Sequence, residues 1–292
     1  MDFLAFIYYN IIVSKIGVCV STCDRPRYIE AFIESIHDCG HILCICDDGY
    51  DPVDNVPKHI KHLRTGKPRS GVAKNKNNGL RYLYEENKCD YIFCLEDDCT
   101  VVNDDIFRKY IEASEKTGIQ HFNFGPGSPW NRKQKDPSII GNLSKRMLAS
   151  QQGDPAPKMI IDYGIDDTEI ALYTHVVGML SFFTRKCIDS VGLYDEDYYN
   201  AWEHVDHTLR IIEEGMQPPF WYFADIVDSC DYIKEQKDEK ANTTLSKNEE
   251  EFNKIVHDGA IIFKNKHGRV PGQIMHETPE NVKQCLKNIY KS

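Results

Sequence analysis

The stretch DYIFCLEDDC, residues 90–99, decides the fold, because an apolar run stops in it abruptly on three consecutive acids. A short run of apolar and aromatic residues predicts a strand buried on both faces, and acids do not belong inside one. We therefore expect Glu96, Asp97 and Asp98 at the carboxyl end of this strand, where open α/β sheets bind ligands. Crowded carboxylates repel one another, and a hard divalent cation offsets that repulsion. The alternative is an acidic turn without a ligand.

The preceding segments predict a strand–helix–strand unit. Residues 16–22 and 41–46 are short apolar, β-branched runs typical of strands. Asp24 is expected to cap the helix between them, and Pro26 suits its first turn. The apolar residues of that helix recur at helical spacing: Ile29, Phe32, Ile33 and Ile36. This order is the unit of a parallel sheet with a right-handed crossover.

Residues 64–84 are basic in their first half and continue as a helical pattern. A basic, amide-rich helix start suits phosphate oxygens, and the alternative is a solvated surface. The whole chain of 292 residues carries a net charge of −10, which argues against a duplex nucleic acid partner. An anionic small molecule is compatible with that charge if a metal or a local basic cluster attracts it.

The eleven cysteines are odd in number and include no CxxC pair, which predicts a reducing, cytoplasmic setting rather than a disulfide framework or a zinc site. Residues 1–13 are almost entirely apolar. They are too short to span a bilayer and lack the features of a signal peptide. A packed strand or short helix is our main interpretation, and a peripheral membrane contact, with a membrane-associated protein, is the alternative.

These pieces, in this order, resemble the nucleotide-binding half of family 2 glycosyltransferases of the GT-A fold. Residues 22–26 match that family's Thr-x-Asn-Arg-Pro-like turn, and residues 47–49 match its Asp-Asp-Gly motif. Residues 71–79 loosely match its Gly-x-x-x-Ala-Arg-Asn-x-Gly helix, and residues 96–98 match its DxD-type motif. The resemblance implies a Rossmann-like, mixed and mostly parallel sheet flanked by helices.

The resemblance also implies roles for individual residues. Asp48 would hydrogen-bond the uracil ring, and either Glu96 or Asp97 would meet the ribose. Asp98 matches the position that binds the metal, Mn²⁺ or Mg²⁺. The other matched positions expected to contact the nucleotide sugar are Thr22, Asp24, Arg25 and Lys76.

The candidate base lies in the segment that begins at Trp202. The family carries a Glu-Asp pair here, and His204 stands where the Asp usually is. Glu203 is favoured as the base because it keeps the first acid of the motif beside Trp202, which can stack on a sugar. Asp206 is the next alternative and His204 the third. A fourth interpretation is an ordinary amphipathic helix whose acidic stripe is solvated, since helical spacing places Glu203 and Asp206 on one face.

The remaining segments are less specific. Residues 125–163 predict loops, either a flap near the substrates or a variable insertion. Residues 174–183 resemble a family strand in which Gly178 permits close backbone approach, and His175 either touches substrate or belongs to the core. Residues 220–227 predict a last strand. A further metal ligand is expected from one of the following: Asp225, Asp228, His257, His267 or His276.

The expected organisation is a GT-A domain over residues 1–232 followed by a helical C-terminal appendage, residues 233–292. Residues 14–105 would form its nucleotide-sugar half and residues 106–232 its acceptor half. The expected activity is inverting, metal-dependent transfer from a nucleotide-sugar donor, a UDP-sugar first, to a hydroxyl of a glycan or glycoconjugate acceptor. One alternative is a nucleotidyltransferase, which would need a Gly-rich loop that residues 22–26 do not contain. The other is a non-catalytic sugar-binding relative.

Overall fold

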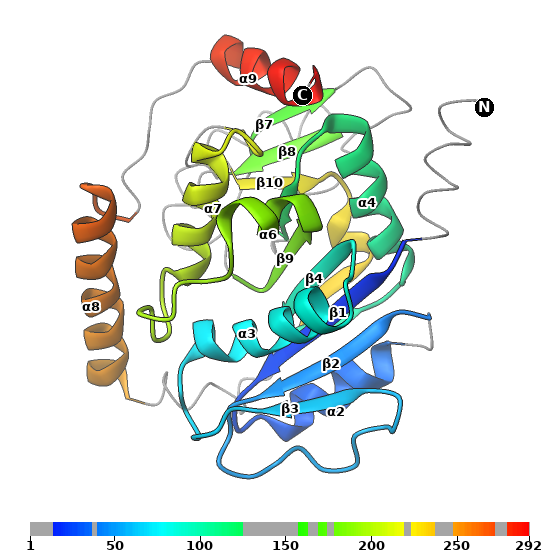
Figure 1. The fold of residues 1–292 in the computed structure, drawn as a ribbon, viewed down its shortest axis with the longest axis vertical. Helices are drawn as coiled ribbons and strands as arrows, with labels where there is room; N and C mark the ends of the chain where they lie inside the picture. Colours follow the sequence, from blue (N-terminus) through cyan, green and yellow to red (C-terminus); the bar gives the residue numbers. More distant parts are fainter. Residues whose placement is uncertain are drawn as a thin grey trace, which may run out of the picture.

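The computed structural model describes residues 14–36, 40–124, 157–162, 169–173, 178–218, 223–236, 248–271 and 279–291. Within them the fold is mixed α/β, built on a six-stranded sheet in the order β3-β2-β1-β4-β9-β6 (Figure 1). Four neighbouring strands are parallel: β3 (Lys61–Arg64), β2 (Ile42–Asp47), β1 (Ile16–Thr22) and β4 (Tyr91–Glu96). β9 (Leu180–Thr184) pairs antiparallel with β4, and β6 (His121–Asn123) pairs antiparallel with β9. The prediction of a mostly parallel sheet flanked by helices is confirmed.

β4 lies inside this sheet, as its apolar sequence predicts. Its residues from Tyr91 to Leu95 are buried, and Glu96 at its end is partly exposed. β4 pairs with β1 up to Ser21 opposite Glu96, and β1 pairs with β2 up to Thr22 opposite Asp47. The three strands therefore end at the same edge, which brings the polar residues that follow them together.

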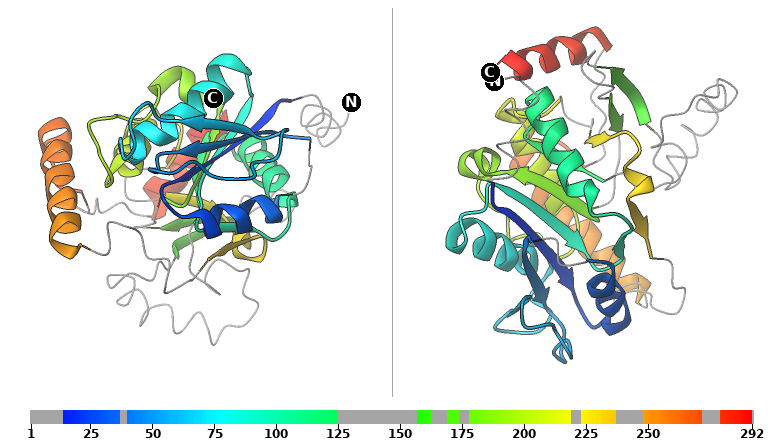
Figure 2. Two further views of the ribbon diagram at one scale, coloured as in Figure 1. Left: turned by 90° about the horizontal axis from the view of Figure 1, so that it is seen from below. Right: turned by 90° about the vertical axis from the view of Figure 1, so that its right-hand side faces the viewer.

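Helices cover both faces of the sheet (Figure 2). Phe93 and Leu95 belong to the apolar core that includes α2 (Pro26–Ser35) and α4 (Asp105–Thr117). The alternate residues Ile92 and Cys94 belong to the core on the other face. That core is formed with α3 (Val72–Leu80), a π-helical continuation (Arg81–Glu86), α6 (Arg185–Val191) and α7 (Glu203–Glu213). Successive side chains of β4 thus point to opposite faces of the sheet and contribute to both cores.

The other strands of the described residues form two smaller sheets. β5 (Cys99–Val101) pairs with β11 (Ile233–Glu235), and β10 (Phe223–Ile226), β8 (Glu169–Tyr173) and β7 (Pro157–Asp162) form a three-stranded sheet. The prediction of a last strand is confirmed for the part described, residues 223–226. The prediction of loops over residues 125–163 is wrong for residues 157–162, which form β7. Residues 1–13, residues 125–156 and His175 lie outside the described residues, so the predictions made for them stay predictions.

Two helices form the C-terminal end, α8 (Glu249–His267) and α9 (Pro279–Lys291). α9 packs on α4 through its buried apolar residues Val282, Leu286 and Ile289. α8 lies beside the start of α7, where Trp202 Nε1 donates a hydrogen bond of 2.9 Å to the carbonyl oxygen of Val256. None of the described helices is long and apolar enough to cross a membrane.

The prediction that Asp24 caps α2 is wrong. Asp24 has a left-handed backbone with φ of 53°, whereas a capping residue has an extended one. Its carboxylate accepts hydrogen bonds from the backbone N–H of Tyr50 at 2.7 Å and from the guanidinium of Arg69 at 3.0 Å. Among the described residues no side chain caps α2, which begins at Pro26. The carboxylate of Asp24 makes a charge-assisted hydrogen bond with Arg69 and therefore does not cap the helix.

Candidate active site

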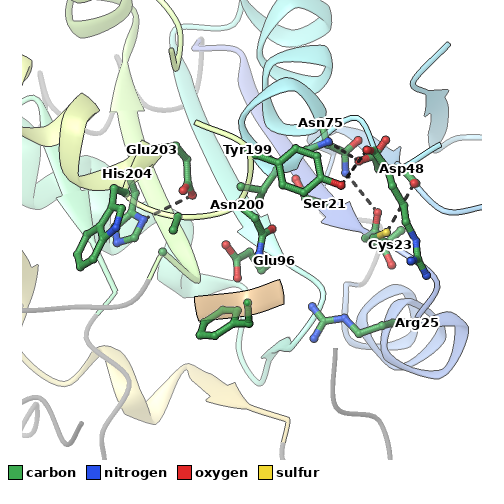
Figure 3. Close-up of a pocket in the computed structure, with 18 of the residues that line it drawn as sticks. Ser21, Cys23, Arg25, Asp48, Asn75, Glu96, Tyr199, Asn200, Glu203 and His204 are labelled. Carbon is green, nitrogen blue, oxygen red and sulfur yellow. Dashed lines mark hydrogen bonds and ion pairs between the residues drawn. The ribbon is translucent and has the colours of Figure 1, made fainter. Parts of the chain in front are cut away.

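A pocket of about 430 Å³ opens at the carboxyl ends of β1, β2 and β4 (Figure 3). This volume lies within the range of about 300–1,000 Å³ that is usual for small-molecule sites. Six of the residues singled out in the sequence line it: Thr22, Arg25, Asp48, Glu96, Asp98 and Glu203. Within the described chain four others do not reach its surface: Asp24, Lys76, Asp97 and Asp206.

The acids that follow β4 point in different directions. Asp97 is fully buried and accepts hydrogen bonds from Thr22 Oγ1 at 2.6 Å and from Arg25 Nε at 3.0 Å. Glu96 and Asp98 reach the pocket instead. β4 ends at Glu96, and Asp97 and Asp98 form the turn that follows it, which separates Asp97 from its two neighbours. Of the two acids expected near a ribose, Glu96 is therefore the one inside the pocket, and Asp97 positions Arg25.

Asp98 presents a carboxylate oxygen suited to a cation. Its Oδ1 is buried and has no hydrogen-bond partner among the described residues, and its Oδ2 lies 3.7 Å from Arg25 Nη1. Burial and the negative charge of Glu96 raise the pKa of Asp98 to about 7. Nowhere in the described parts of the chain do three or more His, Cys, Asp or Glu side chains gather to hold a metal. Asp98 thus fits a Mg²⁺-like ion that takes its other ligands from substrate phosphates and water.

Asp48 organises the loop that leads into α3. Its carboxylate accepts hydrogen bonds from the backbone N–H groups of Ser70 at 2.8 Å and Gly71 at 2.9 Å. The next amide, of Val72, donates to the carbonyl oxygen of Tyr199 at 2.7 Å. These three amides are engaged within the protein, so the expected phosphate contact at this helix start cannot use them. Arg25 and Arg69 in the pocket lining carry the positive charge instead.

Lys76 joins the two sides of the site from below the pocket surface. Its side chain is 1% exposed, and its Nζ lies 2.7 Å from Glu96 Oε1 and 3.0 Å from Glu203 Oε1. It also donates to the carbonyl oxygen of Gly178 at 3.2 Å. Although burial lowers the pKa of Lys76, the two glutamates raise it well above its usual value. Burial alone would raise the pKa of Glu203, but Lys76 holds it far below the usual range.

The three candidate bases lie in the first turn of α7 or next to it, but only Glu203 and His204 line the pocket. Figure 3 shows Glu203 and His204 together on one side of the pocket, opposite Asp48 and Cys23. His204 Nδ1 lies 3.5 Å from Glu203 Oε1. Asp206, one turn further along α7, is fully buried and faces α8 instead.

Asp206 is surrounded by hydrogen-bond donors and basic side chains. It accepts hydrogen bonds from His267 Nε2 at 2.7 Å and from Arg210 Nε at 3.1 Å, and Lys266 Nζ lies 2.8 Å away. His267 and Lys266 belong to the last turn of α8. Asp206 therefore anchors α8, while Glu203 is the one of these two acids that lines the pocket.

Sequence reasoning missed several residues that line the pocket: Ser21, Cys23, Asn75, Tyr199, Asn200, Glu251 and Phe252. Glu251 and Phe252 come from the first turn of α8, about 150 residues beyond the acids of β4. In the sequence Phe252 is one apolar position of an amphipathic pattern, so no signal marks it. Tyr199 and Asn200 precede the recognised Glu203 motif, and their closeness to it was the available signal.

No protein-family model matches the chain, and no curated protein sequence matches it. Among solved structures, Staphylococcus aureus TarS is similar over 94% of this chain and 70% of the other, with 12% identity and a TM-score of 0.49. The chain spans 42% of a longer TarS structure. A Pyrobaculum calidifontis mannosyltransferase in complex with GDP-Man and Mn²⁺ aligns over 70% and 59% of the two chains, with 12% identity and a TM-score of 0.40. A Drosophila β-1,4-galactosyltransferase 7 in complex with manganese, UDP-Gal and xylobiose aligns over 78% and 73%, with 13% identity and a TM-score of 0.42. Similarities this distant do not assign the chain to a family.

Proposed function

We propose that this protein is a metal-dependent glycosyltransferase that uses a nucleoside diphosphate sugar as donor. The observation that carries the proposal is Asp98 Oδ1, which is buried and has no hydrogen-bond partner among the described residues. It lies at the carboxyl edge of a mostly parallel sheet, in a pocket of ligand size. Ligands of open α/β sheets bind at this edge. A carboxylate beside Arg25, in a pocket that Arg69 also lines, suits a diphosphate, which brings its own oxygen ligands to the ion.

The donor would lie along the first half of the chain. Arg25 and Arg69 would bind phosphate oxygens, and Glu96 would accept a hydrogen bond from a ribose hydroxyl. Asp98 would hold Mn²⁺ or Mg²⁺, which supplies Lewis-acid stabilisation of the departing diphosphate. A UDP-sugar is the first donor to test, because the motifs around Asp48 resemble those of family 2 enzymes.

The acceptor would lie against the opposite side, at Glu203. The contact with Lys76 keeps the Glu203 carboxylate ionised near neutral pH, so it is ready to accept the proton of an attacking hydroxyl. A base that faces the leaving diphosphate across the sugar implies one direct displacement with inversion at the anomeric carbon. The acceptor is then a hydroxyl of a glycan or glycoconjugate.

A donor panel tests this function. The protein is incubated with UDP-, GDP- and dTDP-sugars and Mn²⁺, and the nucleoside diphosphate released is measured. We expect metal-dependent release from one nucleotide class, and chelation of the metal should stop it. A nucleotidyltransferase would instead form pyrophosphate from a nucleoside triphosphate and a sugar phosphate. A non-catalytic relative would bind a donor without releasing anything, and either result would refute the proposal.

Replacement of Glu203 by Gln should separate donor binding from transfer. The variant loses the proton acceptor but keeps the shape of the side chain, so transfer to the acceptor should fall by about 10²–10⁴-fold. Donor affinity, measured by calorimetry, should change little. Asp206→Asn is the comparison, because Asp206 does not line the pocket. Loss of transfer in Asp206→Asn, with transfer retained in Glu203→Gln, would show that the wrong acid was chosen.

Metal affinity should weaken on acidification. The pKa of Asp98 in the metal-free protein is raised to about 7, and the ion binds the ionised carboxylate. Below pH 7 the ion must displace a proton, so affinity for Mn²⁺ should fall by about tenfold for each pH unit. Titration of bound Mn²⁺ by electron paramagnetic resonance at pH 6 and pH 8, with the nucleoside diphosphate present, measures the change. Equal affinity at the two pH values would contradict this role of Asp98.

A further inference from the structure

α8 presents one face to the rest of the protein. Residues 252, 256, 259, 263 and 267 recur at intervals of three or four, which places them on a single side of the helix. Four of them are in contact with the body of the protein. Val256 accepts the hydrogen bond from Trp202, Phe263 is fully buried, and His267 donates to Asp206.

The close approach at Gly259 fixes the distance between α8 and the start of α7. A Cβ atom at Gly259 would lie 2.9 Å from Trp202 Cδ1 and 3.1 Å from the carbonyl oxygen of Ala201. No side chain larger than hydrogen fits there without movement. Together with the Asp206 contacts at the far end, this packing holds α8 along its length.

Phe252 is the exception on this face. It lies one turn, about 6 Å, before Val256, yet 39% of its surface is exposed. The exposure arises because the packed face of α8 extends beyond the start of α7 and reaches the pocket, whose lining includes Phe252 and Glu251. An aromatic ring on the packed side of an anchored helix is thus presented to the pocket rather than to a core.

The residues that line the pocket come from two parts of the chain. Tyr199 connects these two parts, because its hydroxyl donates a hydrogen bond to the carbonyl oxygen of Arg69 and its carbonyl oxygen accepts one from the backbone N–H of Val72. The wall proposed for the donor is made by residues before position 100. The other wall is made by Gly178, residues 199–204 and the first turn of α8. We define this second set as the acceptor wall. It carries the carboxylates of Glu203 and Glu251 and, among its lining residues, no Lys or Arg.

We propose that the acceptor is an uncharged sugar ring, and that Phe252 takes the apolar face of that ring while Glu251 accepts hydrogen bonds from its hydroxyls. This inference rests on the proposed function. A pyranose has one face of C–H bonds, which is attracted to the electron-rich face of an aromatic ring. The carboxylate of Glu251 repels a phosphate-bearing acceptor, whereas the charge of Glu203 is compensated by Lys76. An anchored ring also loses little freedom on binding, which favours affinity.

The test compares Phe252→Ala with Ile261→Ala. Ile261 is on the same helix and is 46% exposed, but it does not line the pocket, so its variant controls for loss of an exposed apolar side chain. The probes are the methyl β-glycosides of glucose and galactose and the methyl α-glycoside of mannose, with glycerol 3-phosphate as the anionic competitor. Binding is measured by saturation-transfer NMR with UDP and Mg²⁺ present, and donor hydrolysis without acceptor is measured in parallel.

We expect at least one methyl glycoside to bind the wild-type protein and Ile261→Ala equally, and to bind Phe252→Ala about tenfold more weakly, as for the loss of one aromatic contact. Donor hydrolysis should stay within about twofold in both variants, a difference that corresponds to less than RT. Unchanged glycoside binding in Phe252→Ala would overturn the inference. So would binding of glycerol 3-phosphate alone, or a parallel loss of donor hydrolysis, which would place Phe252 at the donor. If the wild-type protein turns over no donor, the proposed function is refuted instead. Binding of the methyl glycosides is measured without turnover, so it tests the inference about Phe252 separately.

Discussion

Asp98→Asn is expected to abolish metal-dependent release of nucleoside diphosphate. The amide keeps the size of the side chain but removes the charge of the one carboxylate oxygen that lies buried and without a hydrogen-bond partner among the described residues. Loss of a single preorganised electrostatic contact at a leaving group commonly costs about 10²–10³-fold in rate, and here the ion itself would be held less well. The rate is measured at saturating donor over a range of Mn²⁺ concentrations.

The matched control for this variant is Asp51→Asn, which removes the same charge from an exposed position that does not line the pocket. It should keep the wild-type rate and the wild-type dependence on Mn²⁺. A loss confined to Asp98→Asn that high Mn²⁺ partly restores identifies Asp98 as a ligand. A wild-type rate in Asp98→Asn would show that the ion, if it is needed, binds elsewhere.

Lys76→Met is expected to destabilise the fold strongly. Lys76 is 1% exposed and is the cation between Glu96 and Glu203, and the Glu203 side chain is 4% exposed. Removing one partner of a buried ion pair leaves an uncompensated charge and costs about 3–5 kcal/mol of the free energy of unfolding. Urea denaturation followed by far-ultraviolet circular dichroism measures this loss.

Two further variants show whether the loss comes from the ion pair. Lys74→Met changes an exposed lysine on the same helix and should alter the free energy of unfolding by less than about 0.5 kcal/mol. The double variant Lys76→Met/Glu203→Gln also removes one of the two carboxylate charges that Lys76→Met leaves unpaired, so it should recover part of the lost stability, by an interaction free energy of about 0.5–3 kcal/mol. Strict additivity of the two single changes would contradict a direct pairing.

The sheet and the location of the site were predictable from the sequence because they depend on local patterns. The apolar run of residues 91–95 and the acids after it predicted a buried strand that ends at the acids, and β4 has those features. That a ligand binds at this end stays a prediction. The parallel order of β1, β2 and β4 followed from the spacing of strand and helix patterns. This pattern can be recognised in the sequence because a strand that is buried on both faces needs an apolar residue at almost every position.

The directions of individual polar side chains were not predictable. Helical spacing placed Glu203 and Asp206 on one stripe, yet the pocket borders only Glu203, because α8 covers the position of Asp206. Asp24 had the chemistry of a cap but is held by Arg69 instead. In each case the deciding partner lies far along the chain, and single-sequence patterns contain no information about such contacts.

The contact of Lys76 with both Glu96 and Glu203 has a consequence for recombination of this chain with distant homologues. Residues 14–105 contribute Lys76 and Glu96, and residues 106–232 contribute Glu203. A hybrid protein with a crossover between positions 105 and 106 inherits Lys76 and Glu96 from one parent, and the second counter-ion of the lysine, at position 203, from the other. Exchange of substrate preference by swapping these segments should therefore succeed only between parents that carry this lysine and this acid together.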